Sequence, residues 1–200
     1  WAWWLMRPAR QRGEKTGSLW GLSPLPLAQT LRAGFFGGLL YAVLAYSGFF
    51  FAPAAHASVL MPGSLPLWTT LLAWVVLREK IPGSRVLGLG FIVLGDLLVG
   101  GVSLLRAFDG GDVWKGDLLF MSAAFCWSAY SVTVRRYGLD AVRATMAITA
   151  FALVAFVPAY ALLTFTGVLP THLPQVPWSE ILFQAGFQGC GSVVISGITF

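Results

Sequence analysis

One carboxylate stands in the middle of an apolar segment of this chain. Asp96 lies within residues 86–105, and an acid at the centre of a membrane-spanning helix costs about 2.5–3.5 kcal/mol on insertion. A residue kept at that cost predicts a function, either as a proton-coupling group or as the partner of a cationic substrate. The alternative is a protonated acid that packs helices together or faces another subunit.

Aromatic and amide side chains form a second group of candidate binding residues. Trp127 and Tyr130 are three residues apart, so they share a helix face, and Tyr41 lies in an earlier apolar segment. Rings that face a cavity suit flat or cationic substrates. Gln188, in the last apolar segment, could face the same cavity or bond across helices. For the rings, packing or lipid contact is the alternative.

Two prolines interrupt one apolar segment. Pro62 and Pro66 are four residues apart within residues 54–77, and each removes a backbone donor and frees a carbonyl group one turn earlier. Such a break can line a cavity and let a helix bend in a carrier. It can also be a static kink whose free carbonyl groups bond to Ser58 or to a neighbouring helix.

The composition indicates the elements that must position these residues. Hydrophobic residues make up 57% of the 200 residues and charged residues only 10%, against about 25% in a typical soluble domain. This excludes a disordered chain, a coiled coil and a collagen-like repeat. A membrane-spanning helix needs about 20 apolar residues. The predicted spans are residues 33–52, 54–77, 86–105, 118–134, 144–165 and 181–200, with the end of another at residues 1–6.

Basic residues predict the orientation of these spans. Successive connectors lie on opposite sides of the membrane. When they are assigned in turn, eleven of the 13 basic residues fall on one side, which is the cytoplasmic side by the positive-inside rule. A multi-pass protein of the cell inner (plasma) membrane follows, and nucleic acid is not an expected partner. The connectors concerned hold Arg7, Arg10, Arg12, Lys15 and Arg32, then Arg78, Lys80 and Arg85, then Arg135, Arg136 and Arg143.

The remaining polar residues are assigned to span ends or connectors. Asp117 precedes residues 118–134 and is predicted to cap the start of that helix. His56 is predicted to lie at the level of the lipid headgroups. Cys126 and Cys190 lie in apolar segments, so neither a disulfide framework nor a metal site is expected, and no cofactor is predicted.

A short internal repeat predicts the wider architecture. Residues 33–37 (AGFFG) resemble residues 185–189 (AGFQG), 152 residues later. That offset covers five spans, and an odd number gives repeats of opposite orientation, as in many secondary transporters. We therefore expect a helical bundle of two inverted five-helix repeats, truncated at both ends. Residues 1–106 would lack the first helix and most of the second, and residues 116–200 would lack the last two.

Two segments resemble the EamA-type transporters of the drug/metabolite transporter superfamily. Residues 66–79 begin with a proline in mid-helix and end with Glu79 just past the helix, and Trp127 and Tyr130 match the start of the second repeat. The resemblance implies a ten-helix carrier of small metabolites, amino acids or drugs, often moved outward. It also implies that Glu79 ties a loop to its helix. Asp96 departs from the family pattern, which has an apolar or small residue there.

The predicted function is secondary transport, with export favoured, by alternating access around a cavity between the repeats. The expected partners are a small-molecule substrate and the lipid bilayer, and a homodimer is left open. A non-transporting scaffold or receptor subunit is the first alternative. A membrane aspartyl protease is more distant, because the Gly-x-Gly-Asp motif would need glycine where Val93 and Trp114 stand.

Overall fold

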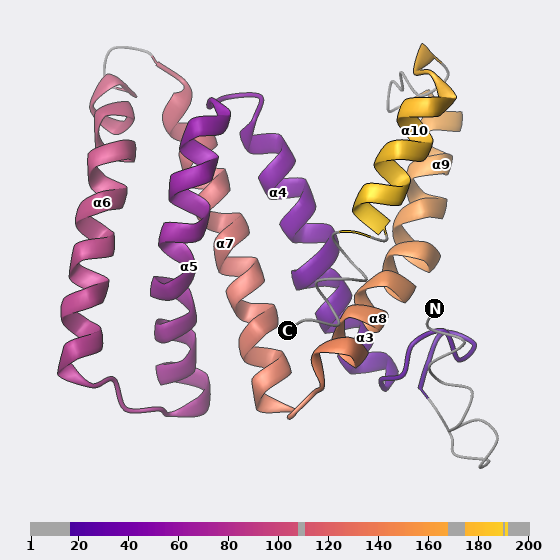
Figure 1. Ribbon diagram of the computed structural model, residues 1–200, viewed down its shortest axis with the longest axis horizontal. Coiled ribbons are helices and arrows are strands. Elements are labelled where there is room, and N and C mark those ends of the chain that lie inside the picture. The colour runs from indigo at the N-terminus through magenta and orange to yellow at the C-terminus, as the bar shows by residue number, and fades with distance from the viewer. Residues whose placement is uncertain (1–16, 108–110, 168–174, 190, 192–200) are drawn as a thin grey trace. The chain divides into compact units, whose positions relative to one another are not determined.

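The computed structural model is helical and describes residues 17–107, 111–167, 175–189 and 191 (Figure 1). Apart from an isolated bridge between Ser18 and Ser23, these residues form no β-structure. The all-helical class is therefore confirmed. Five segments within the described ranges are long and apolar enough to cross a membrane: Leu27–Gly48, Ala54–Leu77, Gly83–Val102, Val113–Arg136 and Ala141–Phe165.

Helix ends differ from the predicted spans wherever polar residues flank an apolar core. Residues 54–77 are helical as predicted, whereas the helix predicted at 118–134 is Val113–Arg136 and the span predicted at 33–52 is Leu27–Gly48. Both helices begin earlier than predicted because backbone hydrogen bonding continues past the apolar stretch, since unpaired amides are costly near lipid. The Leu27–Gly48 segment also ends before the predicted limit at residue 52, although residues 49–52 are apolar. The prediction for residues 1–6 lies outside the described residues, as does most of the one for 181–200.

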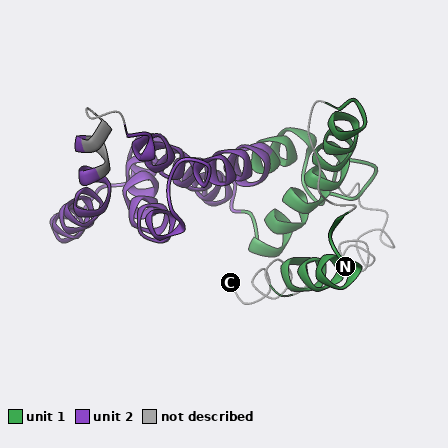
Figure 2. Ribbon diagram, turned by 90° about the horizontal axis from the view of Figure 1, so that it is seen from above, with its two compact units in different colours: residues 1–34, 139–200 green, residues 35–138 purple. Residues whose placement is uncertain are grey.

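The chain divides into two compact units, which are described separately (Figure 2). The unit that we describe first, and call the first unit, is Phe35–Gly138, which Figure 2 draws in purple as unit 2. The one that we call the second joins Trp1–Gly34 to Leu139–Phe200 and is drawn in green as unit 1. The first unit holds the π-helix η1 (Phe35–Leu40) and helices α4 (Tyr41–Gly48), α5 (Ala54–Leu77), α6 (Gly83–Ala107) and α7 (Val113–Arg136). The second holds α3 (Leu27–Gly34), α8 (Ala141–Phe151), η2 (Ala152–Phe156), α9 (Val157–Phe165) and α10 (Trp178–Gly186).

In the second unit, α3 packs closely on α8. Gly34 makes this possible, because a Cβ at that position would lie 2.1 Å from Phe151 Cγ. Thr30 on α3 is fully buried, and its hydroxyl lies 2.6 Å from Ser23 Oγ and donates to the Leu25 carbonyl at 3.2 Å. These bonds fix the segment that leads into α3. Asp140 caps α8 by accepting a hydrogen bond from the Arg143 amide.

In the first unit, α5 and α7 lie side by side and run in the same direction, with α6 as the returning helix (Figure 1). Polar contacts join them along their length. His56 Nδ1 lies 2.8 Å from Asp117 Oδ1 near the start of both helices. In the middle, Ser128 Oγ donates to the Leu65 carbonyl at 3.2 Å and accepts from Thr69 at 3.0 Å. The pair α5–α7 is therefore the frame of this unit.

Small residues bring α4 against the start of α7. A Cβ on Gly116 would lie 2.4 Å from Ala52 Cβ and 2.7 Å from the Gly48 carbonyl oxygen. Gly48 in turn contacts the ring of Phe120, which is fully buried in a core with Leu60. Glycine is needed at these positions because the backbones approach too closely for a side chain.

This packing predicts a large cost for one methyl group. Gly116→Ala should lower the free energy of unfolding by about 1–3 kcal/mol, since a clash with Ala52 and the Gly48 backbone forces the helices apart. The control is Gly88→Ala on α6, where an added Cβ meets nothing within 4 Å. Thermal unfolding of the purified protein in detergent measures both, and equal midpoints would contradict the proposed close approach.

Candidate functional site

Three aromatic residues from two helices come together in the first unit. The Tyr41 ring on α4 lies 5.1 Å from the Trp127 ring on α7, and Tyr130 lies 5.3 Å from Trp127, measured between ring centroids. Trp127 and Tyr130 thus share a helix face, and α4 adds Tyr41. A cavity of about 310 Å3 opens beside them. Its lining is Tyr41, Met61, Pro62, Leu65, Ala124 and Trp127, and we call it the aromatic pocket.

The two prolines of α5 have different surroundings. Both are exposed, but Pro62 lines the aromatic pocket and Pro66 does not. The expected role of Ser58 as a partner of a freed carbonyl is wrong, since its hydroxyl donates to the Ala55 carbonyl at 2.7 Å. Ser128 of α7 donates to the Leu65 carbonyl beside the second proline. The prolines free the carbonyls of residues 58 and 62, so this bond lies next to the break and does not satisfy a freed carbonyl.

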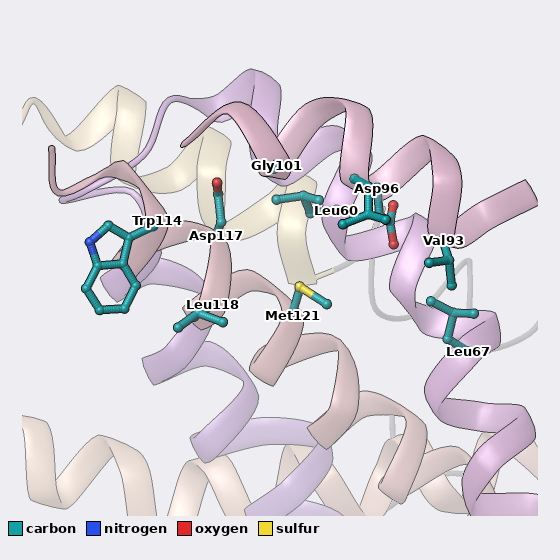
Figure 3. Close-up of a pocket in the computed structure, with 11 residues that line it drawn as sticks. Leu60, Leu67, Val93, Asp96, Gly101, Trp114, Asp117, Leu118 and Met121 are labelled. Carbon is teal, nitrogen blue, oxygen red and sulfur yellow. The ribbon is translucent and has the colours of Figure 1, made fainter. Parts of the chain in front are cut away.

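A second cavity, of about 280 Å3, lies between α5, α6 and α7 (Figure 3). Asp96 from α6, Asp117 from α7 and Trp114 are among its lining residues, but the surface that faces the cavity is almost entirely apolar. The rest of the lining is apolar or glycine: Leu60, Leu67, Val93, Leu97, Gly100, Gly101, Leu118 and Met121. We call this cavity the acidic pocket.

Asp96 is the less satisfied of the two acids. Only 9% of its surface is exposed, and its Oδ2 atom has no hydrogen-bond partner among the described residues. The carboxyl group packs against α5 at Gly63, where an added Cβ would lie 2.3 Å from Oδ1. The acid predicted inside a span is therefore buried between two helices and next to a cavity.

The sequence prediction for Asp117 as a helix cap is wrong. Because α7 begins at Val113, Asp117 lies in the second turn, is 4% exposed and is paired with His56 of α5. The prediction that Asp96 is the single acid within a span is wrong for the same reason. His56 therefore has a definite polar partner. One signal in the sequence could have indicated this pair: a histidine and an acid each lie near the start of an apolar helix.

Glu79 makes a long-range contact instead of a local one. Its carboxylate accepts a hydrogen bond at 2.5 Å from Arg135, 56 residues later, and both side chains are partly exposed. The bond joins the connector after α5 to the last turn of α7, at the end of the pair away from His56. This position is consistent with the expected role of Glu79 in tying a loop to a helix, and that role stays a prediction.

Gln188 belongs to the other compact unit. It follows α10 and is exposed, so its predicted part in a cavity stays a prediction. Within the described residues, no group of three or more His, Cys, Asp or Glu side chains is placed to hold a metal ion. Two pockets in the described part, one aromatic and one acidic, hold the candidate residues that the structure brings together.

Comparison with known proteins relates part of the chain to a family. Residues 3–101 match the sequence model of the EamA-like transporter family. This half of the chain belongs to that family. The chain is also 28% identical, over 157 residues, to a Bacillus subtilis (strain 168) protein called "Uncharacterized transporter YyaM", covering 72% of this chain and 49% of the relative. No solved structure matches the chain significantly.

The comparisons bear on the alternatives as well. The EamA match points to a non-enzymatic transporter, which argues against the aspartyl protease alternative. Both candidate aspartates do line one pocket, but Asp117 is hydrogen-bonded to His56. The chain spans about half the length of the relative it matches, so the activity of the whole protein is taken up as a proposal below.

The His56–Asp117 pair predicts a non-additive effect on stability. His56→Ala should destabilise the protein by about 3 kcal/mol, because the buried carboxyl group loses its partner. His56→Ala combined with Asp117→Asn should recover part of that loss, since the charge is also removed. Unfolding in detergent measures both.

The exposed pair on the same helix supplies the matched control. Lys115 Nζ lies 2.7 Å from Asp112 Oδ1, and both side chains are largely in solvent, so Lys115→Ala should cost less than about 1 kcal/mol. Equal effects of Lys115→Ala and His56→Ala would show that the buried pair has no special importance.

Proposed function

We propose that the chain is part of a secondary transporter for small molecules, and that the aromatic pocket is its substrate site. The observation that carries the proposal is the meeting of Tyr41, Trp127 and Pro62 around a cavity within a chain of the EamA-like transporter family. Cavities between helices of a bundle are common ligand sites, and about 300–1,000 Å3 is their usual size.

The lining of the aromatic pocket favours a flat organic substrate. Tyr41 and Trp127 offer ring faces, and Met61 and Leu65 add apolar surface. An aromatic pair contributes about 0.5–1.5 kcal/mol beyond buried area. Small metabolites, amino acids and drugs with a ring or an apolar side chain fit this chemistry.

Alternating access is the proposed mechanism. Two inverted repeats, residues 1–106 and 116–200 in this chain, would rock around the site. Pro62 supports this because it interrupts the hydrogen bonding of α5 where that helix meets the cavity. Export is the proposed direction, with Asp96 as the candidate for proton coupling.

The proposed orientation places the basic connectors in the cytoplasm. Three connectors, residues 7–32, 78–85 and 135–143, carry most of the basic residues. The bond between Glu79 and Arg135 supports a common side for the last two of these.

Transport should depend on Trp127. Cells that express the full-length protein would be screened with amino acids and aromatic antimicrobial compounds for growth protection, and efflux of the protective compound would then be measured. Trp127→Ala should lower efflux about tenfold, because a loss of about 1.4 kcal/mol is tenfold in affinity. Trp74→Ala, an exposed α5 residue outside the pocket, is the control. Equal efflux by the two variants would refute the aromatic pocket as the substrate site.

Cysteine labelling tests the orientation. In a Cys126→Ala, Cys190→Ala background, Ser84→Cys should react with a membrane-impermeant maleimide in inside-out vesicles and not in intact cells. Asp112→Cys, at the opposite end of the helices, should show the reverse pattern. Labelling of both sites from one side would contradict the proposed topology.

A further inference from the structure

We propose that the acidic pocket binds one acyl chain of a membrane phospholipid. This site goes beyond the proposed transport function, because the acidic pocket and the aromatic pocket share no lining residue. The acidic pocket has a volume of about 280 Å3 and is built by α5, α6 and α7. For comparison, an apolar cavity of about 150 Å3 is already large enough to hold a benzene molecule.

The surface of the acidic pocket selects against a polar ligand. Although Asp96 and Asp117 are among the lining residues, the surface that faces the cavity is almost entirely apolar. The unpaired Oδ2 atom of Asp96 is buried, and Asp117 is hydrogen-bonded to His56. A polar ligand would therefore lose its hydrogen bonds to water without replacement, whereas a hydrocarbon would bury apolar surface.

The pocket is a groove that is open on the exposed side of α6. Leu60 of α5 forms its floor and is 1% exposed, whereas Leu97 of α6 and Leu118 of α7 are 56% and 47% exposed. Helix α6 is apolar enough to cross a membrane, and only 6% of its apolar segment is buried. Since the hydrocarbon core of a bilayer consists of acyl chains, these are the molecules that meet the open side of the groove.

The groove has the direction of an acyl chain. Its lining extends along α6 from Val93 to Gly101 and along α7 from Trp114 to Met121 (Figure 3). At 1.5 Å per residue, these stretches are about 12 Å and 10 Å long. Because both helices are long enough to cross the membrane, a groove along them follows the membrane normal, as acyl chains do.

The depth of the groove assigns the chain to one leaflet. Trp114 lies in the first turn of α7, where an indole ring suits the level of the lipid headgroups. At the other end, Val93 is ten residues from the start of α6 at Gly83, which is about 15 Å along the helix. That is half of a hydrocarbon core about 30 Å thick. The groove therefore spans one leaflet, which is the outer one in the orientation proposed above.

Filling the groove tests the site. Native mass spectrometry of the full-length protein in a mild detergent measures binding of palmitoyl-oleoyl phosphatidylglycerol, and we expect one tightly bound molecule. Gly100→Leu should weaken this binding at least about tenfold. A Cβ at Gly100 would lie 3.6 Å from Leu60 Cδ2, which is an ordinary contact, so the rest of the leucine side chain takes the place of the acyl chain.

Two further variants complete the design. Gly101→Leu is a second filling variant, since Gly101 lines the pocket and an added Cβ meets nothing within 4 Å. Gly95→Leu is the matched control. It adds the same atoms to α6 where a Cβ also meets nothing within 4 Å, but helical periodicity places it on the opposite face from Val93 and Leu97. Its affinity should stay within about twofold of that of the unchanged protein.

The headgroup should matter little. Palmitoyl-oleoyl phosphatidylethanolamine carries the same chains and should bind within about threefold of phosphatidylglycerol, because an exposed charge contributes little. Lys115, beside Trp114, is exposed and paired with Asp112. A preference of tenfold or more for one headgroup would contradict recognition through the chain.

Three other results would overturn the proposal: no lipid bound to the unchanged protein, unchanged affinity in both filling variants, or an equal loss in Gly95→Leu. A dimer mass in place of the lipid adduct would assign the groove to a second copy of the chain. Thermal unfolding confirms that each variant is folded. Efflux without specific lipid binding contradicts this site alone, and lipid binding without efflux contradicts the transport function alone.

Discussion

Polar groups inside the hydrocarbon region need partners within the protein, and in the described helices α5 and α7 supply them to each other. Interhelical hydrogen bonds in membranes are worth about 0.6–2 kcal/mol each, so several along one interface fix a register. His56–Asp117 and Ser128–Leu65 are such bonds at the start and middle of the pair, and the partly exposed Glu79–Arg135 bond ties the connector after α5 to the end of α7. Helices α4 and α6 then pack against a frame that is already specified.

Both pockets follow from this frame. Side chains of α5 and α7 point toward α4 on one side, where Tyr41 completes an aromatic cavity, and toward α6 on the other, where Asp96 completes an acidic one. Gly63 of α5 contacts the carboxyl group of Asp96, while the preceding residue, Pro62, lines the aromatic pocket. A bend of α5 at this point would change the walls of both cavities together.

The sequence predicted what depends on local spacing. The limits of α5 followed from apolar length, the shared face of Trp127 and Tyr130 from helical periodicity, and the position of Asp96 within a helix from composition. The His56–Asp117 pair was missed because it depends on the register of two parallel helices separated by α6. Asp117 was predicted to be a helix cap because the apolar residues alone place the start of the helix at residue 118, whereas α7 begins five residues earlier, at Val113. The meeting of Tyr41 with Trp127 also needed the packing of α4.

The distance in sequence between paired residues has a consequence for biosynthesis. His56 and Asp117 are separated by 61 residues, and at about 5–20 residues per second they leave the ribosome about 3–12 s apart. Throughout that interval α5, with its two prolines and its histidine, has no α7 to bond with. Assembly of this unit therefore waits for the last of its helices, and a nascent chain that stops before residue 117 carries an unpaired polar helix into the bilayer.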